Sequence, residues 1–316
     1  MILTDYFYPE YSSQWDVSAA CGVKKATIRL PETTDFDYAD RNSVHAAIEN
    51  FRSHGFTPII LEPIPNALHE HIKLGDEKRD ECIEKFISLL SVLAEEGVNT
   101  VCFNFMAHYG WTRTGEYPAR AESLVTGFEL ADFRPDETTI AAETLWQNYF
   151  YFIKAVLPHA ERYGVKFALH PDDPPLEKLG GVSRIFTNKD NILRAINTIK
   201  SDCLGVTFCQ ACYKLMGEDL EKTIAELAEK IFFVHFRSVR GDKTNFRETF
   251  HDDGEIDMPS VMRAYVRAGV NVPVRVDHVP TLKGENPRAA GYGSLGRLYA
   301  IGYLKGILQT LEALDD

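Results

Sequence analysis

Short runs of apolar residues recur along the chain, separated by segments about as long as one helix with its turns. Eight of these runs are nearly continuous in apolar residues, which is typical of parallel strands that are covered on both faces. They predict strands at residues 2–8, 25–30, 57–62, 100–105, 166–170, 205–209, 231–237 and 274–278.

Between these runs, apolar residues repeat with helical spacing. In segment 76–96, Phe86, Leu89, Leu90 and Leu93 share one face, charged residues occupy the other, and a glycine follows as a helix stop. The same pattern predicts helices at residues 43–54, 76–96, 138–162, 190–200, 219–230, 259–268 and 296–314. Strand–helix alternation repeated in this way predicts an α/β protein with a (β/α)8 TIM barrel.

The length and the apolar content indicate how the chain is organised. A chain of 316 residues with 45% hydrophobic residues can bury one large core, and α/β barrels of this size often form one domain. We therefore expect a single barrel domain over residues 1–316. Segment 115–136 is the longest without clear periodicity and follows a predicted strand end, which indicates a loop or lid over the rim of the barrel.

The net charge and the cysteines narrow the class of protein. A net charge of −12 without any Lys/Arg-rich run argues against nucleic acid or anionic membrane as a partner. We expect no signal peptide and no membrane span, since no apolar run is long enough for one. Six irregularly spaced cysteines indicate buried thiols in a reducing cytoplasm, and the Cys209–Cys212 pair lacks a thioredoxin-like context for a redox role.

Four of the predicted strands end in a residue that can bind a metal ion. The run KFALH ends at His170, GVTFC at Cys209, FFVH at His235 and VRVD at Asp277. Because all strand ends of a parallel barrel meet at one rim, these side chains can converge on one ion. A thiolate, two imidazoles and a carboxylate suit Mn, Fe, Co or Zn better than Mg or Ca. Taken singly, Cys209 could instead be a buried structural thiol.

Two further residues on these strands are candidates for chemistry. Adjacent strand residues normally point to opposite faces, but His278 stands at the very end of its strand and can lean over the rim beside Asp277. Histidine there is suited to proton transfer. Arg237 is two residues after His235 and so faces the same side of the strand, where it can bind a carboxylate or phosphate of a substrate at the rim. The alternative is an ion pair between Arg237 and a neighbouring Asp.

The remaining candidates lie in segments that follow predicted strands. They are Asn104, Trp111, Arg113, His251, Tyr292 and Arg297. Trp111 and Arg113 could position a polar substrate, or could simply be a packed Trp with a surface Arg. The Tyr292 hydroxyl could act as an acid if it is positioned at the site, and otherwise Tyr292 is a lid residue.

Several motifs in a fixed order resemble the D-mannonate dehydratase family of the xylose-isomerase-like barrels. From about Glu62 to Arg297 these are EPIPNALHEHIKLGDEKRDECIE, FNFM, WTRTG, LHPDDPP, GVTFC, FVHFRSV, NFRETFHDDGEIDM, VDH and GYGSLGR. The resemblance implies a cytoplasmic homo-oligomeric enzyme with Mn(II) or Fe(II) that removes water from D-mannonate to give 2-dehydro-3-deoxy-D-gluconate.

The resemblance also implies roles for individual residues. The metal ligands of the family fall on the four strand-end residues His170, Cys209, His235 and Asp277. Its proton-transfer residues fall on His278 and Tyr292, and which of the two is the base stays open. Apart from the resemblance, the candidates for contact with the substrate are the rim and loop residues Asn104, Trp111, Arg113, Arg237, His251 and Arg297.

The chain also departs from the family pattern. It is shorter than typical members in the N-terminal barrel and in the loop after WTRTG. Val276 and Val279 stand where the family has Pro and Gly around its Asp-His pair, and Arg247 stands where the family tends to have His. An extra arginine near the site predicts a changed or more acidic substrate.

Three functions are therefore weighed. The first is a metal-dependent sugar-acid dehydratase. The second is an isomerase or epimerase for a sugar or sugar acid, but such barrels usually hold their metal with several glutamates, and only Glu62 is a comparable rim carboxylate. The third is a noncatalytic sugar-binding barrel, which would not need a proton-transfer pair. The sequence favours the dehydratase and leaves the metal and the substrate stereochemistry open.

Overall fold

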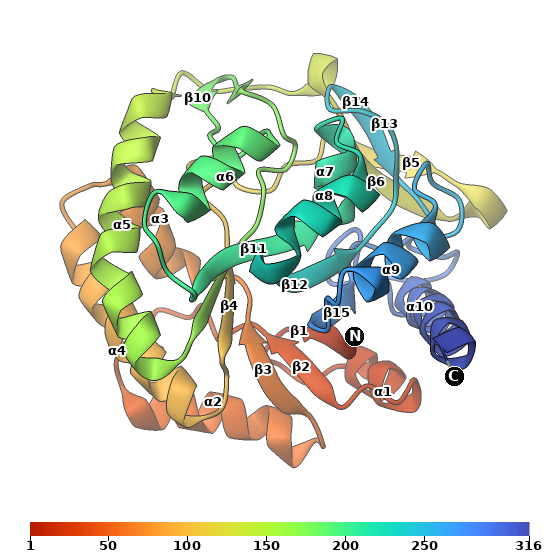
Figure 1. Cartoon of the computed structure of the whole chain (residues 1–316), viewed down its shortest axis with the longest axis horizontal. Coiled ribbons are helices and arrows are strands. Elements are labelled where there is room, and N and C mark those ends of the chain that lie inside the picture. Colours follow the sequence, from red (N-terminus) through yellow and green to blue (C-terminus); the bar gives the residue numbers. More distant parts are fainter. Residues whose placement is uncertain (316) are drawn as a thin grey trace.

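A closed barrel of parallel strands forms the centre of the protein, whose computed structural model describes residues 1–315 (Figure 1). Its strands are β1 (Ile2–Phe7), β2 (Lys25–Ile28), β3 (Thr57–Leu61), β4 (Thr100–Phe103), β8 (Lys166–Leu169), β11 (Leu204–Cys209), β12 (Ile231–Phe236) and β15 (Pro273–Val276). Their order around the barrel is β1-β15-β12-β11-β8-β4-β3-β2, so successive barrel strands are neighbours in space. The predicted (β/α)8 fold is confirmed, and each predicted strand overlaps an observed one.

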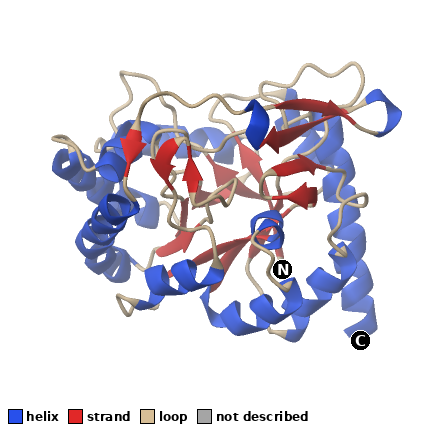
Figure 2. Cartoon of the chain, turned by 90° about the horizontal axis from the view of Figure 1, so that it is seen from above, coloured by secondary structure: helices blue, strands red, loops and turns tan. Residues whose placement is uncertain are grey.

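Helices surround the barrel (Figure 2). They include α2 (Arg41–Ser53), α4 (Arg79–Glu95), α5 (Ala142–Tyr163), α6 (Lys189–Asn197), α8 (Leu220–Leu227), α9 (Met258–Arg267) and α10 (Ser294–Asp315). The apolar face predicted for segment 76–96 is buried, with Phe86, Leu89, Leu90 and Leu93 fully inaccessible on α4. The main core thus lies between the strands and the helices, as binary patterning requires.

Three short helices were not predicted from the sequence. They are α1 (Ser13–Ala20), α3 (Asn66–Leu74) and α7 (Gln210–Leu215). Helix α3 carries His69 and His71 on different sides: His69 is buried against Phe103 and Phe105, whereas His71 pairs with Asp76 at the surface. Its two histidines therefore do not form a joint metal site.

Segment 115–136 contains two strands and is not a continuous loop. It contains β5 (Gly115–Pro118) and β6 (Leu124–Glu129), which join β13 (Val239–Asp242) and β14 (Asn245–Glu248) in the order β13-β14-β6-β5. We call this antiparallel unit the accessory sheet. A Cβ on Gly127 would lie 2.8 Å from the Phe246 carbonyl oxygen, so the close pairing of β6 with β14 requires glycine there. The role of this segment as a lid stays a prediction.

The described chain also holds a small sheet of β7 (Thr139–Ile140), β10 (Gly181–Ser183) and β9 (Lys178–Leu179). Among residues 1–315, no helix is both long enough and apolar enough to cross a membrane.

Candidate active site

A cavity of about 290 Å³ opens at the carboxyl ends of the barrel strands. His235 lines it from β12, while His170, Asp277 and His278 line it from positions just after their strands. Parallel strands bring these ends to one rim, which is the usual location of an active site in this fold.

The four predicted metal ligands lie together at this rim. The ligand atoms of Cys209, His235 and Asp277 lie within 4.8 Å of one another, and so do those of His170, Cys209 and Cys212. Because Cys209 belongs to both groups, the four strand ends converge on one place. Cys212, which the sequence did not favour as a ligand, lies beside them.

Buried polar atoms without partners make this cluster suitable for an ion. Neither ring nitrogen of His235 makes a hydrogen bond among the described residues, although Nε2 lies 3.1 Å from Glu62 Oε1 and Nδ1 lies 3.4 Å from Asp277 Oδ2. Nδ1 of His170 donates to the Pro171 carbonyl oxygen at 2.6 Å, which leaves Nε2 as the ligand nitrogen. A thiolate, two imidazoles and a carboxylate therefore fit a borderline divalent cation.

The electrostatics of the cluster favour an ionised Cys209. Burial raises the pKa of its thiol, but the hydrogen bond from the Cys212 thiol and the charge of Arg237 outweigh burial, so the pKa lies well below its ordinary value. Burial likewise raises the pKa of Asp277, and the charges of Arg275, His278 and His235 bring it well below normal. Both groups are thus in the deprotonated form that a metal ligand needs.

The backbone at the end of β15 explains how two consecutive residues reach the same rim. The strand ends at Val276, and His278 has a φ of +32°, in the left-handed region that few residues other than Gly, Asn, Asp and His adopt. This turn breaks the strand alternation, so both Asp277 and His278 face the cavity. Local strain of this kind is typical of functional sites.

Tyr292 lies beside His278, with 5.4 Å between the ring centroids. A β-bridge between Val279 and Tyr292 fixes the loop that carries it. Burial, followed by the charge of Asp277, holds the pKa of Tyr292 well above its ordinary value. The hydroxyl therefore keeps its proton at neutral pH and can act as a proton donor.

The predicted substrate-binding residues divide into two sets. Asn104, Trp111 and Arg237 line the cavity. Arg113, His251 and Arg297 are not among the residues that line it. The largely covered side chain of Arg113 pairs with Asp173, which lines the cavity, and with Glu248, which does not. Arg297 of α10 is fully buried and pairs with Asp5 of β1.

His251 is held behind the rim by backbone and packing. Its Nε2 donates to the Phe236 carbonyl oxygen at 2.8 Å, and its ring stacks on Phe236 with 5.2 Å between centroids. Burial lowers its pKa from 6.5 to about 4.

This buried neutral histidine predicts a loss of stability in acid. Between pH 6.5 and 4 the unfolded chain binds a proton at His251 that the folded chain does not. Stability present above pH 6.5 is therefore lost as the pH falls, by about 3 kcal/mol in total. We expect His251→Gln to remove much of this dependence. Urea unfolding of chelator-treated protein across this pH range measures it, and parallel curves for the two proteins would contradict the assignment.

Arg247 does not support the expectation of a more acidic substrate. It lies on β14 away from the cavity lining, with its guanidinium 3.4 Å above the Tyr117 ring and 3.0 Å from Glu129. Its place is explained by the accessory sheet, where it ties β14 to β5 and β6.

Two site residues were missed from the sequence. Arg275 of β15 binds both oxygens of Glu62, at 2.9 and 3.0 Å, and contacts Asp277 at 2.8 Å. Arg275 precedes Asp277 by two residues and so faces the same side of the strand, and this spacing could have identified it as a site residue. Glu248 of β14 contacts Nδ1 of His278 at 2.7 Å. No spacing rule predicts that contact, because it depends on the packing of the accessory sheet.

The fold and the site together define a (β/α)8 barrel with candidate metal-binding groups and a His–Tyr pair at its rim. The model of the family described as D-mannonate dehydratase (UxuA) matches residues 13–138 and 130–316. This chain belongs to the D-mannonate dehydratase family. The predicted resemblance is confirmed, and so is the predicted enzyme class, a carbon–oxygen lyase of the hydro-lyase type.

Curated relatives cover most of the chain. The mannonate dehydratase of Streptococcus uberis is 31% identical over 308 residues, which are 86% of this chain and 86% of the relative. The mannonate dehydratase of Brachyspira hyodysenteriae is 32% identical over 285 residues, 78% of this chain and 80% of the relative.

Solved structures agree with the fold. The crystal structure of mannonate dehydratase from Streptococcus suis serotype 2 has a TM-score of 0.91 at 28% identity and covers 100% of this chain and 95% of its own. D-psicose 3-epimerase from Clostridium cellulolyticum H10 has a TM-score of 0.64 at 13% identity, covering 98% of this chain and 99% of its own, which shows the barrel alone.

Proposed function

We propose that this protein removes water from D-mannonate, or a close analogue, to give 2-dehydro-3-deoxy-D-gluconate. The observation that carries the proposal is a cluster of four candidate ligands, three of which line the same cavity as His278 and Tyr292, in a member of this family. His170, Cys209, His235 and Asp277 would hold Mn(II) or Fe(II). Such an ion supplies Lewis-acid stabilisation of negative charge on substrate oxygens.

Elimination of water needs a base for the C2 proton and an acid for the departing C3 hydroxyl. The raised pKa of Tyr292 keeps its hydroxyl protonated, which suits it to protonate the leaving group. His278 then takes the C2 proton. The electron pair of the C2–H bond forms the C2=C3 double bond as the C3–O bond breaks, and the resulting enol rearranges to the 2-keto acid.

The arginines of the rim offset its carboxylates. Four basic side chains line the cavity, Arg29, Lys73, Arg237 and Arg275, against the three carboxylates of Glu62, Asp173 and Asp277. An acidic protein can thus present a site that accepts an anionic sugar acid.

The state of Glu62 argues against the isomerase or epimerase alternative. Barrels that catalyse such a reaction usually use a free rim carboxylate as the base. Glu62 is held by Arg275 at both oxygens, and although burial raises its pKa, Arg275 and His235 lower it to about 2. A carboxylate bound in this way is a weak base.

A turnover assay tests the proposal. Protein loaded with Mn(II) or Fe(II) under reducing conditions is expected to convert D-mannonate to a 2-keto-3-deoxy acid. Tyr292→Phe is expected to lower kcat by about 10²-fold, since only the donated proton is lost. Epimerised or isomerised sugar in place of the keto acid would support the alternative, and metal binding without any product would reject this substrate.

We also propose a cytoplasmic homo-oligomer. The family membership and the six free thiols support this proposal. Light scattering coupled to size-exclusion chromatography measures the oligomeric state, and a mass near 35.7 kDa would reject an oligomer.

A further inference from the structure

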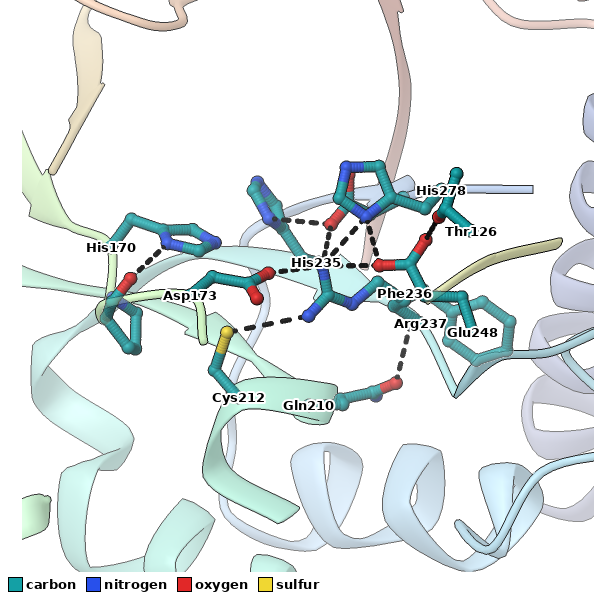
Figure 3. A network of polar contacts seen from close by, with 12 residues as sticks. Thr126, His170, Asp173, Gln210, Cys212, His235, Phe236, Arg237, Glu248 and His278 are labelled. Atoms are coloured by element: carbon teal, nitrogen blue, oxygen red, sulfur yellow. Dashed lines mark hydrogen bonds and ion pairs between the residues drawn. The ribbon is translucent and has the colours of Figure 1, made fainter. Parts of the chain in front are cut away.

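A network of buried charges lies directly behind His278 (Figure 3). Glu248 of β14 contacts His278, and both Arg113 and Arg237 contact Glu248. Asp173 joins the two arginines from the other side. Glu248 does not line the cavity and is only 3% exposed, so it acts on a substrate only through its neighbours.

Nδ1 of His278 lies close to one hydrogen-bond acceptor and one hydrogen-bond donor. Glu248 Oε1 is 2.7 Å away and Arg237 Nη1 is 2.8 Å away. A carboxylate only accepts hydrogen bonds and a guanidinium only donates them, so a single ring nitrogen satisfies one of the two. The choice decides which nitrogen of His278 carries the proton.

The other contacts of Arg237 decide in favour of Glu248. Its Nη1 has two hydrogens and two further acceptors, Asp173 Oδ2 at 2.9 Å and Asp277 Oδ2 at 3.4 Å. Arg237 therefore does not need the His278 nitrogen. An unprotonated Nδ1 would face the Glu248 oxygen with a lone pair at 2.7 Å, which is repulsive. Nδ1 thus carries hydrogen and donates to Glu248.

The position of Glu248 is itself fixed by the accessory sheet. Thr126 of β6 donates to Oε2 at 2.6 Å, and Arg113 donates through Nε to Oε1 at 3.2 Å. Arg113 is in turn held by both oxygens of Asp173, at 2.8 and 2.9 Å. The segment that carries Arg113 and Thr126 therefore holds the Glu248 carboxylate against the ring of His278, and Asp173 holds Arg113 in place.

The hydrogen bond from Nδ1 to Glu248 leaves Nε2 as the ring nitrogen that can offer a lone pair. Nε2 lies 3.7 Å from Asp277 Oδ1, beyond hydrogen-bond distance but beside the ligand cluster. Trp111 packs on the ring, with 4.7 Å between centroids. Nε2 of His278 therefore lies beside the candidate metal ligands in the cavity, where it can reach a substrate bound there.

We propose that Glu248 is a positioning residue that holds His278 with hydrogen on Nδ1 and leaves Nε2 to accept the substrate proton. This inference rests on the proposed function, in which His278 is the base. It makes the accessory sheet a contributor to catalysis, because β14 supplies Glu248 and β6 supplies the hydroxyl that holds it.

Substitution of Glu248 gives the kinetic test. Glu248→Ala is expected to lower kcat by about 10²-fold and to leave KM within about threefold, because the tautomer governs proton transfer rather than binding. Glu248→Gln is expected to recover part of the loss, since its amide oxygen can still accept from Nδ1. The matched control is Glu129→Ala, which removes another carboxylate of the same sheet that pairs with Arg247. It should keep wild-type kcat.

A spectroscopic measurement reads the tautomer without turnover. The Zn(II)-loaded protein is labelled with 15N in its histidine rings and recorded at about pH 8. The signal of His278 is identified by its absence in His278→Asn. We expect the protonated nitrogen to be Nδ1 in the wild type and in Glu129→Ala, and to shift toward Nε2 in Glu248→Ala.

The outcomes separate this inference from the proposed function. Hydrogen on Nε2 in the wild type, or equal kcat for Glu248→Ala and Glu129→Ala, overturns the role of Glu248 while leaving His278 as the base. Full activity of His278→Asn overturns the proposed function itself. If Glu248→Ala does not fold, the wild-type spectrum and Glu248→Gln still decide the question.

Discussion

His278→Asn is expected to lower kcat for dehydration by about 10²- to 10⁴-fold, the range that one general base contributes. Asparagine tolerates the left-handed φ of +32° at this position nearly as well as histidine, so the backbone after Asp277 should be kept. The substitution removes the ring nitrogen and leaves the four candidate ligands in place. Steady-state kinetics together with bound-metal analysis measure the effect.

The control for this experiment is another buried histidine near the rim. His251→Gln removes an imidazole that does not line the cavity. The variant should retain most of the activity at about pH 7.5, where the wild-type His251 is neutral. Wild-type turnover by His278→Asn, or an equal loss in His251→Gln, would contradict the assignment of the base.

Cys209→Ala is expected to abolish metal binding and activity together. It removes the thiolate shared by both candidate ligand groups at the rim. Affinity for the ion should fall by more than about 100-fold, since even the outer partners of metal ligands change affinity by 10–100-fold. Loading with Co(II) gives a direct readout, because thiolate ligation produces a charge-transfer absorption that the variant should lack.

A second buried cysteine of the barrel provides the matched control. Cys102 on β4 forms a rival group with Glu62 and His235, within the same 4.8 Å limit. Burial raises the pKa of Cys102 to about 11, and Glu62 is already bound by Arg275, so this group is poorly suited to an ion. Cys102→Ala should keep metal and activity. If Cys102→Ala loses the metal and Cys209→Ala retains it, the metal is bound by the group of Glu62, Cys102 and His235 instead.

The strands and their ends were predictable because each depends on local pattern. Continuous apolar runs specify buried parallel strands, and a parallel barrel brings all carboxyl ends to one rim. His170, Cys209, His235 and Asp277 could therefore be grouped before any distance was known. The helix on residues 79–95 was equally clear from its apolar face.

The accessory sheet was not predictable in this way. Strand β6 pairs with β14, more than a hundred residues later in the chain, so neither shows the pattern of a local hairpin with the other. Arg113 and Arg297 looked like candidates for substrate contact because their positions follow strands. In the structure neither lines the cavity: Arg113 pairs with Glu248 as well as Asp173, and Arg297 pairs with the buried Asp5.

By itself, the sequence determined the barrel, the family and the residue types at the strand ends, because periodicity and strand direction act over short segments. Only the tertiary structure decided how these residues are held. The left-handed φ of His278 turns its side chain to the rim, and two contacts join separate segments of the chain: Arg275 binds Glu62, and Glu248 binds His278. Such contacts depend on side-chain reach and packing across elements, which no local pattern encodes.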